Sequence, residues 1–242
     1  MKSRIPIVAL ALIAAGMTGC SATEPGPDTD IRLKATGTAP VDIRLDWKGA
    51  EPGTALQAIE FATEPDKYTT LGFLPAAQRT YEHLDLIPET PFYYRVRPVH
   101  GPASEPVLVN LRAESFDPPA AEPDVSWADP RIVPDSKAVA RTIGEPRTEG
   151  AAAPTALRAT VMTRDAIKFT WSDNASDEEG YLLEVKPEQT ADWTVAMAID
   201  PNINSVGLTV LATERSSAFR VRAYRYGESS NVVHRITGKN ES

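Results

Sequence analysis

Apolar and polar residues alternate along this chain in short runs, and the same runs occur twice. Residues 41–47 (VDIRLDW) alternate without a break, and residues 167–171 (IKFTW) do the same. Strict alternation is typical of a β-strand that buries one face. The closing tryptophans, Trp47 and Trp171, lie 124 residues apart. The pattern therefore predicts strands within an internal repeat.

The repeat extends over most of the chain with almost no drift. Three further apolar pairs keep an offset of 124 or 125 residues: Leu33 with Leu157, Ile59 with Leu183, and Val96 with Val221. Four matching strands at one offset indicate a duplication.

Each copy is predicted to contain about seven short strands separated by turns rich in Pro, Gly, Asn and Asp, which is typical of a β-sandwich. In the first copy we expect strands near 31–35, 41–47, 57–62, 67–74, 80–86, 92–97 and 106–111. In the second copy we expect them near 156–162, 166–171, 181–186, 193–199, 205–211, 218–224 and 231–237.

The stretch WSDNASDEEGYLLE, residues 171–184, resembles the bacterial fibronectin type III domain. In that family a strand-B tryptophan packs into the core and a Gly-Tyr pair opens strand C. Trp171, Gly180 and Tyr181 match these positions, and Trp47 matches the first of them in the other copy. The resemblance implies an all-β chain of two tandem immunoglobulin-like (fibronectin type III) β-sandwiches.

The predicted division of the chain follows from the repeat. It comprises a tether at 20–30, one sandwich at 31–112, a linker rich in Pro, Ala and Glu at 113–153, a second sandwich at 154–237 and a tail at 238–242. Forty residues is long for a connection inside a compact domain. Five apolar residues nevertheless leave open whether part of the linker docks onto a sandwich: Phe116, Val125, Trp127, Ile132 and Val133.

The first twenty residues predict export and lipidation. Lys2 and Arg4 precede an apolar run at 5–15, which is too short to span a bilayer and is typical of a secretory signal. Residues 17–20 (MTGC) resemble the lipobox of bacterial lipoproteins, which implies a signal peptide at 1–19 and acylation of Cys20, such as by palmitate. Cys20 is the only cysteine, and the alternative is an ordinary signal peptide beside a stray cysteine.

Composition excludes some classes of function. A net charge of −8 argues against nucleic-acid binding, which depends on clustered Lys and Arg. The three histidines, His83, His100 and His234, have no neighbours at metal-ligand spacing, and no nucleophile or phosphate-loop motif occurs. We therefore expect no catalytic residues, no metal and no cofactor.

The acidic loop between residues 173 and 179 has two interpretations. Its carboxylates could hold calcium, because this cation prefers clustered oxygens. The loop lacks the alternating acids and central glycine of the calcium-loop motif, so a solvated connection between strands is favoured.

Two repeated charge patterns and a few aromatic residues are the remaining candidates. Arginines 95, 97, 220 and 222 are predicted to face Glu60 and Glu184 across neighbouring strands, which is favoured over an anion-binding patch. Trp47 and Trp171 are predicted to be core residues. Three aromatic residues could stack on a ligand, although edge packing is favoured for them too: Trp193, Tyr224 and Tyr226.

These observations predict a non-catalytic, lipid-anchored protein of the cell envelope that presents two modules for protein or glycan binding. Ser21 would imply the outer membrane if the host is Gram-negative. One alternative is a structural spacer or subunit of an envelope or secretion assembly. Another is an accessory to a polysaccharide-active enzyme, which would need paired carboxylates that the sequence does not single out.

Overall fold

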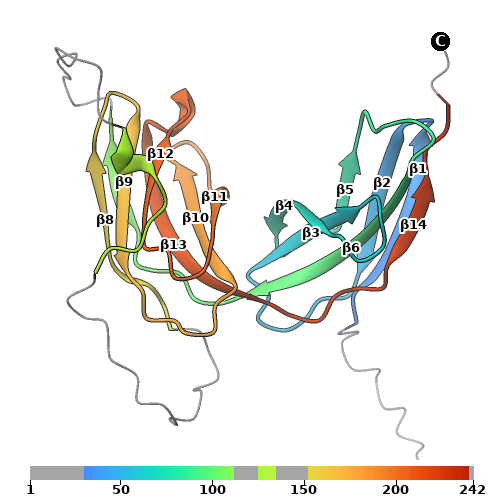
Figure 1. The fold of residues 1–242 in the computed structure, drawn as a ribbon, viewed down its shortest axis with the longest axis horizontal. Coiled ribbons are helices and arrows are strands. Elements are labelled where there is room, and N and C mark those ends of the chain that lie inside the picture. The colour runs from blue at the N-terminus through green and yellow to red at the C-terminus, as the bar shows by residue number, and fades with distance from the viewer. Residues whose placement is uncertain (1–29, 112–124, 135–151, 240–242) are drawn as a thin grey trace, which may run out of the picture.

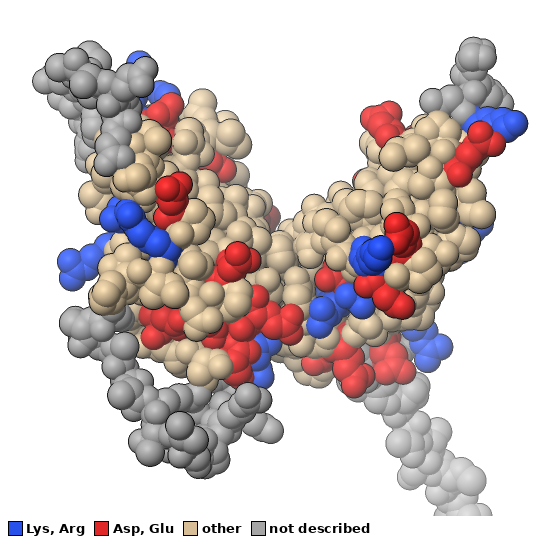
Figure 2. Space-filling model, in the orientation of Figure 1, with Lys and Arg blue, Asp and Glu red and all other residues tan. Residues whose placement is uncertain are grey.

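The computed structural model describes residues 30–111, 125–134 and 152–239, which form two β-sandwich lobes. Fourteen strands and two short 3-10 turns account for the regular structure of these residues. Figure 1 shows the lobes meeting at one end and diverging from there, and the space-filling view in Figure 2 shows the open notch between them. The predicted all-β fold is confirmed.

Lobe 1 packs a three-stranded sheet against a four-stranded sheet. The first sheet runs, in spatial order, through β1 (Arg32–Ala39), β2 (Asp42–Lys48) and β5 (Thr80–His83). The second runs through β4 (Thr69–Pro75), β3 (Leu56–Ala62), β6 (Pro91–His100) and β14 (Val233–Ile236).

Lobe 2 repeats this architecture. Its three-stranded sheet contains β8 (Thr155–Val161), β9 (Ala166–Ser172) and β12 (Ser205–Thr209). Its four-stranded sheet contains β11 (Thr194–Ile199), β10 (Gly180–Pro187), β13 (Ser216–Tyr226) and β7 (Val107–Asn110). Both lobes thus have the A-B-E and C′-C-F-G sheets of a fibronectin type III sandwich, and every strand overlaps a predicted one.

The last strand of each copy lies in the other lobe, and here the structure differs from the predicted domain bounds. β7 follows β6 in the chain but pairs antiparallel with β13, placing Leu108 opposite Ala218. β14 follows β13 but pairs with β6, placing His234 opposite Tyr93. Each lobe is therefore completed by a strand from the other half of the chain.

The two crossing connections are held by matching hydrogen bonds. The Ser104 N–H donates to the Val221 carbonyl, and the Val221 N–H donates to Ser104 Oγ at 3.1 Å. In the other connection the Ser230 N–H donates to the Val96 carbonyl, and the Val96 N–H donates to Ser230 Oγ at 3.0 Å. The exchange is thus reciprocal and nearly symmetric.

A glycine makes the first crossing possible. Gly101 has a φ of +130°, and a Cβ at this position would lie 2.0 Å from the carbonyl oxygen of Ala223. Only a residue without a side chain fits so close to the neighbouring backbone. The chain therefore runs straight on from β6 past β13, where a hairpin would have turned back.

A shared apolar cluster and a short strand pairing join the lobes. His100 and Val99 of β6 pair with Arg225 and Tyr226 of β13, which links the two four-stranded sheets into one of eight strands. The outer faces of the sheets meet in a cluster of eight apolar residues: Leu56, Ala58, Phe73, Val99, Leu182, Val195, Tyr224 and Tyr226.

Each lobe also has its own core between its two sheets. The predicted core tryptophans, Trp47 and Trp171, are 2% and 4% exposed and belong to the cores of lobes 1 and 2 respectively. Burial of apolar area at about 25 cal/mol per Å² is the main stabilising contribution of these cores.

Part of the linker docks, which answers the question that the sequence left open. Arg131 bridges to Ser205 of β12, and the Asn204 side chain accepts from the Val133 N–H at 2.6 Å and donates to the Val133 carbonyl at 2.9 Å. Trp127 is half-buried and packs over Gly207, where a Cβ would lie 2.8 Å from its ring. Residues 125–134 thus cover one edge of lobe 2, while Phe116 lies outside the described residues.

No helix within the described ranges is long and apolar enough to span a bilayer.

The strand exchange predicts that the chain stays assembled after it is cut. A protease site inserted between residues 112 and 124 and then cleaved should leave both fragments in one particle on size exclusion, because each fragment supplies a strand to the lobe of the other. Cleavage followed by 6 M guanidinium chloride should release them, which is the control. Separate elution of the fragments in native buffer would contradict the exchange.

Candidate binding surface

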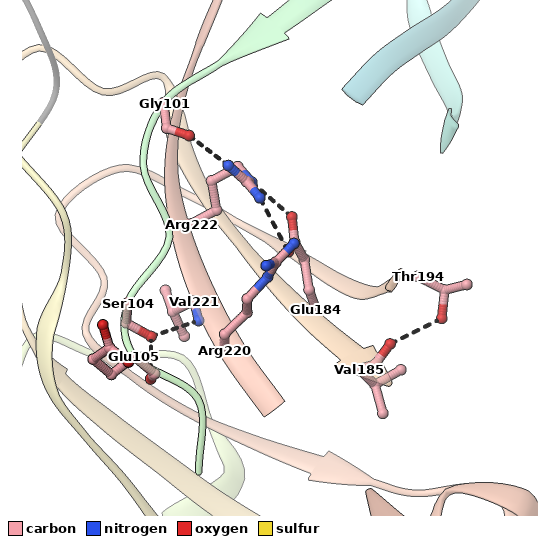
Figure 3. Close-up of polar contacts among 9 residues, drawn as sticks. All are labelled: Gly101, Ser104, Glu105, Glu184, Val185, Thr194, Arg220, Val221 and Arg222. Carbon is pink, nitrogen blue, oxygen red and sulfur yellow. Dashed lines mark hydrogen bonds and ion pairs between the residues drawn. The ribbon is translucent and has the colours of Figure 1, made fainter. Parts of the chain in front are cut away.

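A buried carboxylate between two arginines lies on the outer face of the four-stranded sheet in lobe 2. Alternation along β10 and β13 points Leu183 and Val221 inward, so Glu184, Arg220 and Arg222 project from the opposite face. Glu184 is 0% exposed and accepts hydrogen bonds from Nε of both arginines, at 2.7 Å for Arg222. Arg222 also donates to the Gly101 carbonyl at 2.5 Å, which ties this cluster to the first crossing (Figure 3).

Lobe 1 contains the equivalent cluster. Glu60 is 5% exposed and accepts from Arg95 Nε at 2.5 Å, while Arg97 lies 4.0 Å away. The predicted cross-strand pairing is therefore confirmed in both copies. The carboxylates are buried, however, so removing one partner of these pairs would leave an uncompensated charge away from water, which costs more than breaking the exposed pairs that the sequence indicated.

An aromatic ring covers each of three arginines. The Arg220 guanidinium carbon lies 4.1 Å from the centre of the Trp193 ring, and that of Arg95 lies 4.0 Å from the centre of the Tyr68 ring. Arg97 lies 3.9 Å from the Tyr226 ring. Such cation–π contacts contribute about 0.5–1 kcal/mol at exposed sites and more where water is excluded.

The aromatic candidates therefore have different roles. Trp193 is half-buried, with its ring engaged by Arg220. Tyr224 is 8% exposed and packs against Phe73 in the shared cluster, so it is not a free stacking platform. Tyr68, which the sequence analysis missed, is equivalent to Trp193 at the repeat offset of 125 residues, and that offset could have identified it.

The three histidines contact side chains of different kinds. His83 Nδ1 lies 3.1 Å from the Tyr94 hydroxyl, and burial lowers the pKa of this histidine. His100 Nε2 lies 3.1 Å from Glu51 Oε1. His234 stacks on Tyr93 with 4.5 Å between ring centroids. In the part of the chain that the structure describes, no three His, Cys, Asp or Glu side chains are arranged to hold a metal ion.

The acidic loop is tied to its own lobe. Asp173 accepts hydrogen bonds from the Tyr181 hydroxyl and the Ala175 N–H, and Asp177 lies 3.6 Å from Arg225 Nη1. Glu178 accepts from the Asn202 N–H at 3.2 Å. Burial, together with the nearby carboxylates of Asp173 and Asp177, raises the pKa of Glu178. The loop thus connects two strands, as favoured, but Glu178 is buried where a solvated side chain was expected.

Acidic side chains gather around the base of the notch. Figure 2 shows Asp and Glu on both lobes beside their junction. A groove of about 800 Å³ opens in this region of lobe 1, lined by Asp30, Arg32, Glu51, Glu228 and Asn231 among others. Asn231 binds β1 there through two hydrogen bonds: its side chain accepts from the Leu33 N–H at 2.8 Å and donates to the Leu33 carbonyl at 3.0 Å.

The predicted lipidation site, Cys20, lies outside the described residues, as do the signal peptide at 1–19 and most of the tether at 20–30.

The known proteins that this chain resembles come from the solved structures. No family model matches the chain, and no curated protein sequence matches it at a significant level. Among solved structures, a two-domain fibronectin type III segment of chicken tenascin is 10% identical, with 87% of this chain and 99% of that chain covered and a TM-score of 0.27.

Two pectate lyases are also similar over part of the chain. PelI from Erwinia chrysanthemi, solved in complex with tetragalacturonic acid, is 23% identical over 29% of this chain, with a TM-score of 0.28. Pel3 from Pectobacterium carotovorum is 20% identical over 30% of this chain, also with a TM-score of 0.28. The matches span 24% and 22% of the two lyases. With TM-scores this low, the assignment to the fibronectin type III fold rests on the observed strand order.

The charge cluster in lobe 2 predicts a large loss of stability on removing its carboxylate. Glu184→Gln should lower the free energy of unfolding by about 3–5 kcal/mol, because two partly buried arginines then lose their counter-charge. Urea denaturation measures this change. The matched control is Asp46→Asn, which removes an exposed partner of Arg44 and should cost at most about 1 kcal/mol. Equal effects of the two substitutions would contradict the structural role of Glu184.

Because the pKa of Glu178 is raised, we expect that neutralising this side chain stabilises the fold and that the size of this effect depends on pH. The folded state binds the Glu178 proton more tightly than the unfolded state does. Protonated Glu178 therefore adds to the stability of the fold below the ordinary glutamate pKa of about 4.3, and this contribution is lost as the pH rises through the higher folded pKa. Glu178→Gln should therefore raise Tm at pH 7 and have less effect at pH 4. Glu179→Gln, next to it on the same loop, is the matched control for removing one negative charge from this loop. An unchanged or lower Tm for Glu178→Gln at pH 7 would contradict the prediction.

Proposed function

We propose that this chain is a lipid-anchored, non-catalytic binding protein of the cell envelope, in which two joined sandwiches present their outer sheet faces to a partner. The observation that carries the proposal is the two-lobed frame joined by strand exchange and the shared apolar cluster. The architecture supports a binding or spacer role, since it fixes two surfaces relative to one another.

The sequence of the N-terminus supports the anchor. The apolar run, the MTGC motif and the single cysteine match the pattern of bacterial lipoprotein precursors. One acyl chain holds a protein only marginally, whereas two or three hold it stably. In this proposal the acylated Cys20 tethers lobe 1, because β1 begins soon after the tether.

A spacer or assembly subunit is the second candidate, and the same frame favours it. Two lobes joined at one junction would hold whatever lobe 2 contacts at a set distance from lobe 1. The two functions differ in whether lobe 2 has a surface that recognises a partner directly.

The anchor is tested by fractionation and intact mass. Wild-type protein expressed in a Gram-negative host should appear in the outer-membrane fraction with diacylglyceryl and acyl masses added at Cys20, whereas Cys20→Ala should remain unprocessed and lack those masses. Ser21→Asp is a second variant, which should move the protein to the inner membrane. A wild type cleaved at another position and recovered without lipid would overturn the anchor and leave a secreted binding protein.

A further inference from the structure

The strap, residues 125–134, lies along the outer edge of β12 in lobe 2. The Arg131 N–H donates to the Ser205 carbonyl at 3.0 Å, and the Asn204 N–H donates to the Arg131 carbonyl at 3.3 Å. The Asn204 side chain holds both backbone groups of Val133. The chain therefore adds a short extended segment of its own to this edge of the sheet.

The equivalent edge of lobe 1, on β5, is closed by its own side chains. The strand registers match Thr80 with Ser205 and Glu82 with Gly207. The Gln78 side chain donates to the Thr80 carbonyl at 2.8 Å, which is the position that the strap uses in lobe 2. Glu82 is exposed, and a charge on an edge strand discourages pairing with another strand. Lobe 2 has a glycine where lobe 1 places this charge.

Gly207 makes the edge of lobe 2 able to receive an added segment. A Cβ at Gly207 would lie 2.5 Å from the Ala128 Cα and 2.8 Å from the Trp127 ring. Gly207 is not among the glycines with a positive φ, so space and not backbone conformation requires glycine here. The edge is therefore shaped to accept an aromatic ring from the segment that covers it.

The strap satisfies only part of this edge. The Trp171 N–H donates to the Asn204 carbonyl, and hydrogen bonds alternate along an antiparallel pair, so the backbone groups of Ser205 and Gly207 face away from β9. No hydrogen bond joins the described strap to the Gly207 backbone. Ser205 is 0% exposed, and its Oγ has no hydrogen-bond partner among the described residues. A buried polar group left unpaired is costly, so a segment that paired with both residues would fit the edge better than the strap does.

The strap also buries little apolar surface and is not paired with its neighbours in the chain. Val125 and Ile132 are 60% and 67% exposed. The strap lies between β7 and β8 in the sequence, but these two strands pair with β13 and β9. Release of the strap would therefore leave the strand pairing of lobe 2 intact.

We propose that the β12 edge of lobe 2 binds an extended segment of a partner protein by β-strand addition, and that the strap occupies this site until the partner displaces it. In antiparallel pairing, the partner residue opposite Gly207 is aromatic, because a ring covers the space that an edge glycine leaves. The partner residue opposite Ser205, two positions further along, carries a hydroxyl or an amide that bonds the serine Oγ. This inference rests on the proposed binding function and adds to it a site and a class of partner.

Two substitutions at one position separate release of the strap from other effects. Arg131→Pro removes the N–H that bonds Ser205, so the strap should leave the edge. Arg131→Ala removes the side chain but keeps this N–H, and it is the matched control. A strapless chain, with Gly and Ser in place of residues 125–134, removes the strap outright. Gly207→Glu gives lobe 2 the charge that Glu82 places on the edge of lobe 1, so it should block the site.

The experiment measures binding of the fluorescein-labelled peptide Lys-Val-Trp-Val-Thr-Val-Lys to the full chain purified in detergent. Binding should tighten about tenfold or more in Arg131→Pro and in the strapless chain, because the strap no longer competes for the site. Arg131→Ala should bind as the wild type does, and Gly207→Glu added to the strapless chain should abolish binding. The peptide Lys-Val-Thr-Val-Trp-Val-Lys, in which the ring and the hydroxyl are exchanged, should bind more weakly to the strapless chain.

Several outcomes would overturn the proposal. Equal binding by the wild type and the strapless chain, or no saturable binding by either, would leave the strap as a plain cover of the edge. Binding that survives Gly207→Glu would place the peptide elsewhere, and concentration-dependent dimerisation of the strapless chain would make a second copy the occupant.

Two further readouts keep the test decisive. Thermal unfolding identifies any variant that fails to fold, and the comparison of the two peptides needs no substitution in β12 if Gly207→Glu is such a variant. Failure of peptide binding with normal membrane anchoring overturns only this inference, because the anchor is measured separately by fractionation.

Discussion

The reciprocal exchange of the last strands is the constraint on which the rest of this structure depends. Without β7, β13 would expose a row of unpaired backbone groups, and without β14 the same would be true of part of β6. Unpaired backbone groups are costly where they are removed from water. Neither half of the chain can therefore complete its sandwich with its own strands in this arrangement, and the two copies form one structural unit.

The buried charges follow from the same constraint. Arg222 reaches both Glu184 and the Gly101 carbonyl, so one side chain joins the sheet face of lobe 2 to the connection arriving from lobe 1. A buried ion pair often adds little net stability compared with an apolar alternative, but it is favourable only when the charged groups are placed accurately. We interpret the cluster as fixing the path of the first crossing, in addition to holding neighbouring strands together.

The sequence allowed the strands, the core tryptophans and the Glu–Arg pairs to be predicted, because each depends on alternation within a short segment or on the repeat offset. It could not show the exchange. Val107 and Val233 both begin strands that fit either lobe, and alternation tells which side of a strand is buried but not which sheet receives it. The exchange depends on tertiary contacts such as the close approach of Gly101 to Ala223, which local alternation does not encode.

The position of β14 also determines how the molecule would respond to mechanical load. Because of the exchange, the first and last described strands lie in the same lobe, where Arg235 donates to the Ala35 carbonyl at 3.1 Å and Asn231 holds Leu33. A pulling force applied between residues 30 and 239 would therefore pass through lobe 1 and first act on the contacts between β1 and β14. Lobe 2 stands outside that force path and would keep its shape while lobe 1 bears the tension.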